Sequence, residues 1–179
     1  MQPNLKKLES EELGRKSIEE YKETQKMPIV VVLDNVRSAN NVGSIFRTSD
    51  AFLIERLCLC GITCTPPNKD IQKTALGAQL SVPWNYAQST VEQVQELRQQ
   101  GYRIIAVEQA QGSIMLQNFK LQANEKIALI MGNEVFGVSN EVMALCDACI
   151  EIPQFGTKHS FNVAVTFGMV LWEISRKRV

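Results

Sequence analysis

Short and almost uninterrupted apolar runs recur along the chain after residue 28. Five of them are rich in Val, Ile, Leu and Cys, and they cover residues 29–33, 57–60, 103–107, 127–131 and 149–152. A continuous apolar run, as opposed to strict alternation, is typical of a strand that is buried on both faces, as in a parallel sheet covered by helices. The pattern therefore predicts five interior strands.

Helical patterns fill the segments between these runs, near residues 41–52, 89–100, 138–146 and 161–177. The second is the most clearly delimited, with Ser89 as N-cap, Glu92 as capping-box partner and Gly101 as the stop. Alternating strands and helices predict the α/β class, with a parallel sheet flanked by helices. Ligands of such sheets bind beyond the carboxyl ends of the strands, so the chemistry is expected in the segments that follow them.

Residues 1–28 differ from the rest because they carry six basic and six acidic side chains and few apolar ones. Such a segment lacks a full core-facing stripe. We expect a charged helical extension over residues 1–28, ended by Pro28, and a single domain over residues 29–179. The extension is either a solvated appendage or an arm that contacts a nucleic acid or a partner subunit.

The overall charge excludes a histone-like or arm-type nucleic-acid binder. The 179 residues hold 19 Lys and Arg against 19 Asp and Glu, so no global positive field draws the protein to a polyanion, although a local basic site is compatible with this balance. The amino terminus lacks the apolar core of a secretory signal, and no apolar run approaches the ~20 residues of a membrane span. We expect a cytoplasmic protein with no membrane association.

Several common sites are absent from the sequence. There is no G-x-G, no P-loop and no G-x-S-x-G, and the single histidine, His159, adjoins Ser160, where a catalytic pair is unfavourable. The cysteines allow one alternative, a zinc site made by Cys58-x-Cys60 and Cys146-x-x-Cys149. Cys58 and Cys60 alternate with leucine in a predicted strand, however, which favours small buried apolar side chains and no metal.

Polar and glycine-containing segments follow three of the predicted strands. In residues 34–52, Asn40 and Asn41 are candidate helix caps, Gly43 allows close approach of another backbone, and Arg47 follows on the helix. A generic interpretation makes Arg47 a surface ion-pair residue.

The second segment is Gly132-x-Glu134-x-x-Gly137, where Gly132 suits close approach of a ligand or chain segment. Glu134 is either a functional carboxylate or an acid at a helix start. In the third segment, residues 152–173, Ser160 and Asn162 are candidate caps of the last helix, and Lys158 with His159 adds local positive charge that suits a phosphate.

Together these segments resemble the three motifs of the SpoU (TrmH-type) RNA 2′-O-ribose methyltransferases, a branch of the SPOUT superfamily. The resemblance runs in order from about residue 29 to 175. Motif one is N-x-G-x-x-x-R-T-x-D-A-F, which begins at Asn41 and contains Arg47. Motif two is Gly132-x-Glu134-x-x-Gly137. Motif three is I-P-x-x-G-x-x-x-S-F-N-V, which begins at Ile152 and contains Gly156, Ser160 and Asn162.

The resemblance implies a parallel α/β sheet with a C-terminal deep trefoil knot that binds S-adenosylmethionine (AdoMet). It also implies a homodimer with its active sites at the subunit interface. The residues that match cofactor contacts are Gly132, Ile152 and Phe161, and Glu108, after the 103–107 strand, is a weaker candidate.

The resemblance also implies catalytic roles. Arg47 matches the residue that activates the ribose 2′-hydroxyl, while Asn41, Glu134, Ser160 and Asn162 match residues that position Arg47, the RNA or the knot loops. Because a guanidinium is not normally deprotonated in proteins, Arg47 has the alternative role of clamping a phosphate that accepts the hydroxyl proton.

The expected function is AdoMet-dependent methylation of a ribose 2′-hydroxyl in structured RNA. The expected target is tRNA, because the domain with its short extension has no separate RNA-binding domain beside it. An rRNA target is one alternative, and a non-catalytic RNA-binding assembly factor with the same fold is the other.

Overall fold

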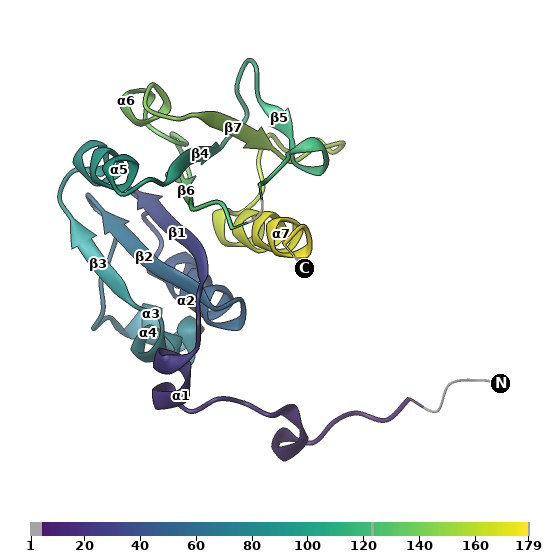
Figure 1. Cartoon of the computed structure of the whole chain (residues 1–179). Coiled ribbons are helices and arrows are strands. Elements are labelled where there is room, and N and C mark those ends of the chain that lie inside the picture. The colour runs from purple at the N-terminus through teal and green to yellow at the C-terminus, as the bar shows by residue number, and fades with distance from the viewer. Residues whose placement is uncertain (1–4, 123, 179) are drawn as a thin grey trace.

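The computed structural model describes residues 5–122 and 124–178, which fold around one seven-stranded sheet (Figure 1). The strand order is β3-β2-β1-β6-β4-β7-β5, and every neighbouring pair is parallel. The strands are β1 (Met27–Asp34), β2 (Ile54–Cys60), β3 (Trp84–Ala87), β4 (Arg103–Val107), β5 (Ile114–Met115), β6 (Ile127–Met131) and β7 (Ala148–Glu151). The predicted α/β class and parallel sheet are confirmed.

Helices cover both faces of the sheet (Figure 1). One face packs against α2 (Ala39–Ala51), α3 (Lys69–Ala75), α4 (Ala78–Ser81) and α7 (Val163–Arg176). The other face packs against α5 (Thr90–Gln99) and α6 (Asn140–Met143). Two 3₁₀ turns, η1 (Ser10–Leu13) and η2 (Leu116–Asn118), complete the elements together with α1 (Ile18–Glu23).

The central strand β1 shows why the apolar runs are continuous. Its odd-numbered side chains Ile29, Val31 and Leu33 enter the core beneath α2 and α7, whereas Val30 and Val32 enter the core beneath α5. Successive side chains of a strand point to opposite faces, so a strand covered on both sides needs apolar residues at every position.

All five predicted strands are present, and the structure adds two that the pattern did not predict. β3 is an edge strand whose residues alternate between exposed and half-buried, so it lacks a continuous apolar run. β5, on the opposite edge, has two residues. The helices α3 and α4 were also not predicted, and the helix expected over residues 138–146 is shortened to α6.

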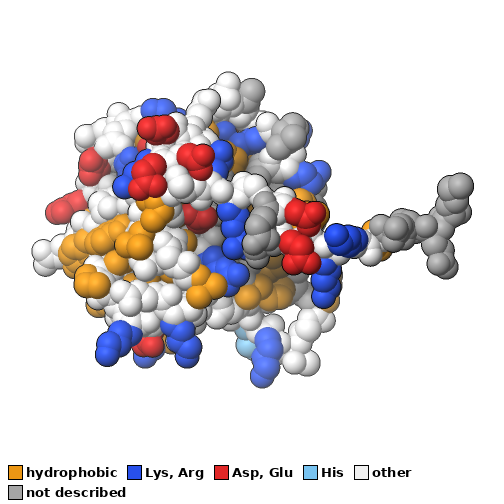
Figure 2. Space-filling model, turned by 90° about the horizontal axis from the view of Figure 1, so that it is seen from below, with side chains coloured by type: hydrophobic (Ala, Val, Ile, Leu, Met, Phe, Trp, Pro, Cys, Tyr) orange, Lys and Arg blue, Asp and Glu red, His pale blue; other side chains and the backbone are white. Residues whose placement is uncertain are grey.

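The described part of the N-terminal extension contains η1 and α1. Tyr21 of α1 is buried in the core, whereas the chain before α1 runs away from the body (Figures 1 and 2). The prediction that Pro28 ends a helix is wrong, because α1 ends at Glu23 and Pro28 lies within β1. Figure 2, which views the molecule from below, shows basic, acidic and hydrophobic side chains together on that face.

The register of the central strands determines where the site lies. Met131, the last residue of β6, is level with Leu33 of β1 on one side and with Val107 of β4 on the other. The next residues of these three strands, Asp34, Gly132 and Glu108, therefore lie side by side at the carboxyl edge of the sheet.

Candidate active site

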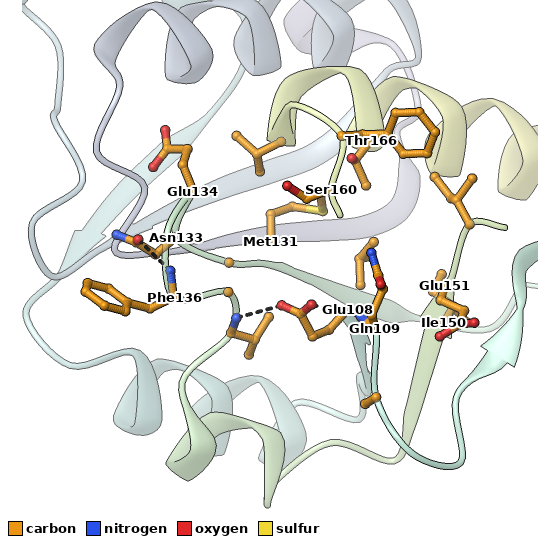
Figure 3. A pocket seen from close by; sticks show the side chains of 18 of the residues that line it. Glu108, Gln109, Met131, Asn133, Glu134, Phe136, Ile150, Glu151, Ser160 and Thr166 are labelled. Atoms are coloured by element: carbon orange, nitrogen blue, oxygen red, sulfur yellow. Dashed lines mark hydrogen bonds between the residues drawn. The ribbon is translucent and has the colours of Figure 1, made fainter. Parts of the chain in front are cut away.

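A cavity of about 670 Å³ lies at this edge, between the segments that follow β4, β6 and β7 and the first turn of α7 (Figure 3). Most of the predicted site residues line it, namely Glu108, Gly132, Glu134, Ile152, Ser160, Phe161 and Asn162. Asn41 and Arg47 do not belong to its lining. Three segments that are distant in the sequence thus meet at one cavity.

The loop after β6 folds back tightly over the end of its own strand. A Cβ on Gly132 would lie 2.3 Å from the backbone of Gly137 and Val138, so the close approach that was predicted for this glycine is confirmed. Asn133 and Gly137 exchange two backbone hydrogen bonds of 2.9 Å, and the Asn133 Oδ1 accepts from the NH groups of Val135 and Phe136. The loop has a defined shape that depends on glycine at position 132.

Glu134 points from this loop toward α2 (Figure 3). Its carboxylate accepts hydrogen bonds from the NH groups of Arg37 at 2.8 Å and Ser38 at 3.0 Å, and from the Asn41 Nδ2 at 2.9 Å. Partial burial tends to raise the pKa of Glu134, but these hydrogen bonds outweigh burial and lower its pKa below the ordinary value of 4.5. The side chain is therefore a carboxylate that joins the β6–α6 loop to the start of α2.

Asn41 continues this connection to the last helix. The Asn162 Nδ2 donates to the Asn41 Oδ1 at 3.0 Å, while the Asn162 Oδ1 caps α7 by accepting from the NH groups of Ala164 and Val165. The predicted cap role of Asn162 is confirmed, whereas that of Ser160 is wrong, because the helix begins directly after Asn162. The N-cap of α2 is Ser38, so the prediction that Asn40 or Asn41 caps that helix is wrong. Asn41 is instead the middle member of a three-residue chain, Glu134–Asn41–Asn162.

Arg47 lies on the exposed side of α2, outside the cavity of its own chain. Asn40 and Ser44 lie on the same face of α2 as Arg47, because they precede Arg47 by seven and three residues. Among residues 5–122 and 124–178 its guanidinium makes no hydrogen bond or ion pair, which does not support the generic surface ion pair. Gly43, one turn earlier, is packed so closely on α3 that a Cβ there would lie 2.4 Å from the Ile71 carbonyl oxygen.

Several polar residues at the cavity were not predicted from the sequence, and Asn133 and Gln109 are two of them. Asn133 lies in an unassigned position of motif two and donates from its Nδ2 to the Asn35 carbonyl at 2.7 Å. Gln109 follows β4 and donates from its Nε2 to the His159 carbonyl at 2.6 Å, which fixes the segment before α7. The sequence signal that could have identified both residues is their position just beyond the end of a strand.

The cavity has an acidic lining. Its described lining includes the carboxylates of Glu108, Glu134 and Glu151, and no Lys, Arg or His. The Glu151 carboxylate accepts from the Ser113 hydroxyl at 2.6 Å. Such a lining suits a cationic ligand better than a phosphate group. Lys158 and His159, for which a phosphate contact is predicted, are exposed on the loop before α7 and lie outside the cavity lining.

The cysteine pairs do not form one metal site. Cys58 and Cys60 lie on β2, whereas Cys146 and Cys149 lie at β7, and three strands separate β2 from β7. Burial raises the pKa of Cys58 to about 11 and that of Cys60 to about 12. Within the described residues, no cluster of three or more His, Cys, Asp or Glu side chains is placed to hold a metal ion. The described helices also include none long and apolar enough to cross a membrane.

Comparison with known proteins identifies the family. Residues 28–172 match the model of the SpoU rRNA methylase family. The chain belongs to this family. It is 31% identical over 152 residues to the 23S rRNA (guanosine-2′-O-)-methyltransferase RlmB of Neisseria meningitidis, an alignment that covers 85% of this chain and 60% of RlmB.

Solved structures of similar proteins share the fold. An AdoMet-bound rRNA methyltransferase from Sinorhizobium meliloti superposes with a TM-score of 0.80 at 30% identity, over 87% of this chain and 58% of that one. A protein whose structure was solved in a study of the 2-OH methylation of C/U34 on tRNA superposes with a TM-score of 0.73 at 25% identity, over 83% of this chain and 95% of that one. This chain thus spans less than two thirds of RlmB and of the S. meliloti enzyme.

Proposed function

We propose that the protein transfers a methyl group from AdoMet to the 2′-hydroxyl of a ribose in structured RNA. The observation that carries the proposal is the Glu134–Asn41–Asn162 chain, which connects the cavity to the helix that bears Arg47. All three family motifs contribute a member to it. A non-catalytic RNA-binding descendant has no need to keep these polar side chains hydrogen-bonded to one another, so the arrangement favours an enzyme.

The cavity suits AdoMet in size and in charge. AdoMet carries a sulfonium, which supplies an electrophilic methyl group, and an acidic lining without basic side chains favours such a cation. Gly132, Ile152 and Phe161 are proposed to hold the cofactor, and Glu108, which also lines the cavity, is a weaker candidate. The segment that follows β7 is proposed to thread the trefoil knot of the domain over residues 29–179.

Each polar residue has a proposed role toward the ribose. Arg47 binds a backbone phosphate of the RNA, and this phosphate accepts the proton that leaves the ribose 2′-hydroxyl. A permanently charged guanidinium performs this role without losing a proton of its own. Asn41, Glu134 and Asn162 are proposed to fix α2 against the cavity, and Ser160, which lines the cavity, is proposed to position the RNA. Holding nucleophile and methyl group in near-attack geometry can supply ~7–11 kcal/mol toward the barrier.

The proposed target is tRNA, and the proposed location is the cytoplasm. The target assignment is supported by the relative that this chain matches over 95% of its length, since that protein was studied for methylation of tRNA. An rRNA target is the second candidate, supported by the likeness to RlmB. The proposed role of the extension over residues 1–28 is contact with RNA or with a partner subunit.

We also propose that the enzyme is a homodimer whose active site is completed at the subunit interface. Two observations support this arrangement. Val165 and Trp172 expose apolar side chains, seven residues apart, on one face of α7, and Phe52 packs edge-on against the Trp172 ring. Arg47 lies outside the cavity of its own chain, as expected of a residue that acts where two subunits meet.

The test is transfer of labelled methyl from AdoMet to separately purified tRNA and rRNA, with Arg47→Ala alongside. The proposal predicts label in the ribose of one of these RNAs, lost in Arg47→Ala, while calorimetry shows unchanged AdoMet binding by that variant. Label in a base would contradict ribose methylation. AdoMet binding without transfer to any RNA tested, including assembling ribosomal particles, would favour the non-catalytic alternative.

A further inference from the structure

Two carboxylates lie on either side of the loop that follows β6. In the sheet, β6 is flanked by β1 and β4, and the aligned register places Asp34, Gly132 and Glu108 at one level. Asp34 ends β1 and Glu108 immediately follows β4. The loop, residues 132–139, therefore leaves the sheet between two acidic side chains.

Asp34 holds the loop from the β1 side. Its side chain is buried, with 1% exposure, and its Oδ2 accepts a hydrogen bond of 2.9 Å from the Ser139 NH. Its Oδ1 accepts from the Thr90 hydroxyl at 2.7 Å and from the Asn35 Nδ2 at 2.9 Å. A buried carboxylate is tolerated where such donors surround it, and a bond to a charged acceptor is stronger than one between neutral groups.

Glu108 holds the loop from the β4 side. Its Oε2 accepts from the Val138 NH at 3.1 Å, a bond drawn in Figure 3, and its Oε1 accepts from the Gln109 NH at 2.8 Å. A Cβ on Gly137 would lie 2.1 Å from the same Oε2, and the φ of Gly137 is +69°, so a glycine there lets the carboxylate reach the loop.

The two carboxylates thus bind the NH groups of consecutive residues, Val138 and Ser139, from opposite sides. We propose that Asp34 and Glu108 are positioning residues that clamp the 132–139 loop in the shape that receives AdoMet. Asp34 lies outside the cavity lining and acts through the loop alone. A loop fixed before binding loses less conformational freedom on binding, so the clamp raises cofactor affinity. This inference rests on the proposed function, because it concerns the same cofactor site.

The test compares Asp34→Asn and Glu108→Gln with the unmodified protein. AdoMet affinity is measured by calorimetry, and amide exchange of residues 132–143 is measured by mass spectrometry on the protein without AdoMet. Each variant replaces a charged acceptor with a neutral amide of the same shape. We expect AdoMet to bind about tenfold more weakly in each, the scale of losing one charge-assisted hydrogen bond. We also expect faster exchange confined to this loop.

Thr90→Val is the matched control. It removes a hydrogen bond from the same Asp34 carboxylate, but on the side of α5, and leaves the Ser139 contact in place. We expect it to lower thermal stability while AdoMet affinity and loop exchange stay unchanged. If Thr90→Val weakened AdoMet binding as much as Asp34→Asn, the effect would be one of general stability and the clamp would be overturned.

The remaining outcomes are also decisive. Unchanged AdoMet affinity and unchanged loop exchange in both carboxylate variants would overturn the clamp while leaving the proposed function intact. If Asp34→Asn did not fold, Glu108→Gln would test the clamp from the cavity side, and its exchange without AdoMet separates positioning from direct cofactor contact. Failure of the unmodified protein to bind AdoMet would overturn the proposed function. Amide exchange of the loop in the carboxylate variants would still test the clamp, because it is measured without AdoMet.

Discussion

The Asn41 Nδ2 lies 2.9 Å from the Glu134 Oε1, although the two residues are 93 positions apart in the chain. One belongs to the helix that carries Arg47 and the other to the loop that lines the cavity. The contact fixes the start of α2 against this loop. A displacement of either element therefore alters the distance between the cavity and the RNA-binding side chain proposed on α2.

The first prediction concerns the pH dependence of stability. The pKa of Glu134 is lower in the folded protein than its ordinary value of 4.5. A lowered folded-state pKa contributes stability that is present above the unfolded-state pKa and is lost as the pH falls through the folded-state value. We expect Glu134→Gln to lower the free energy of unfolding by about 1 kcal/mol at pH 7. The value is modest because the side chain is only partly buried and water screens its charge.

Urea unfolding of both proteins between pH 7 and pH 3 measures this difference. The difference in stability between the two proteins should shrink as the pH falls below about 4.5, which is the ordinary pKa of a glutamate and applies to the unfolded state. Glu23→Gln, which removes an exposed carboxylate at the end of α1, is the control and should show no such difference. A Glu134→Gln difference that stayed constant over this range would show that its hydrogen bonds do not depend on charge.

The second prediction concerns Gly132→Ala. The added Cβ would lie 2.3 Å from backbone atoms of Gly137 and Val138, which cannot move aside without opening the loop. We expect AdoMet binding, followed by calorimetry, to be lost or weakened more than tenfold. Gly156→Ala is the control, because a Cβ at that position meets no atom within 4 Å. Equal AdoMet affinity of the two variants would show that the close packing at Gly132 is not needed for binding.

Prediction of the fold from the sequence succeeded where burial is two-sided. The 127–131 run is covered on both faces, so every position is apolar and the strand is recognisable. The edge strand β3 carries Trp84 and Tyr86, both exposed, and alternates with half-buried residues, so its pattern does not stand out from a loop. Strand β5 is too short to give any pattern.

Prediction of the site was limited by contacts between distant residues. The motifs identified Asn41 and Asn162, but their mutual hydrogen bond spans 121 positions and has no local signature. Asp34 was not singled out because it reads as the polar end of a strand. The role proposed for Asp34 depends on the alignment of β1 with β6, and a single sequence does not provide that register.

The third prediction concerns the thiols. Iodoacetamide reacts with thiolates, and burial raises the pKa of Cys58 and Cys60 to about 11 and 12. We expect mass spectrometry to find both unmodified after treatment of the folded protein at pH 8, and alkylated once the protein is unfolded in urea. Rapid alkylation of the folded protein at Cys58 or Cys60 would contradict the buried position of β2.

Removal of metal ions by a chelator should leave the thermal midpoint of the protein unchanged.

The fourth prediction concerns assembly. Trp172 is 62% exposed on α7, and Trp172→Arg would place a charge in the proposed subunit interface. We therefore expect this variant to weaken the dimer. Large aromatic side chains at interface centres contribute about 2 kcal/mol or more, so the dimer dissociation constant should rise at least about 30-fold. Light scattering coupled to gel filtration measures the change. Methyl transfer should fall with dimer content, because Arg47 lies outside the cavity of its own chain.

Leu80→Arg is the matched control for assembly, because Leu80 is similarly exposed, at 64%, but lies on α4. It should leave the dimer and methyl transfer unchanged. An unmodified protein that is monomeric at micromolar concentration would contradict the homodimer, and so would a Trp172→Arg variant that dimerises as strongly as the unmodified chain. Loss of dimer in both variants would show that added positive charge, independent of position, disfavours assembly.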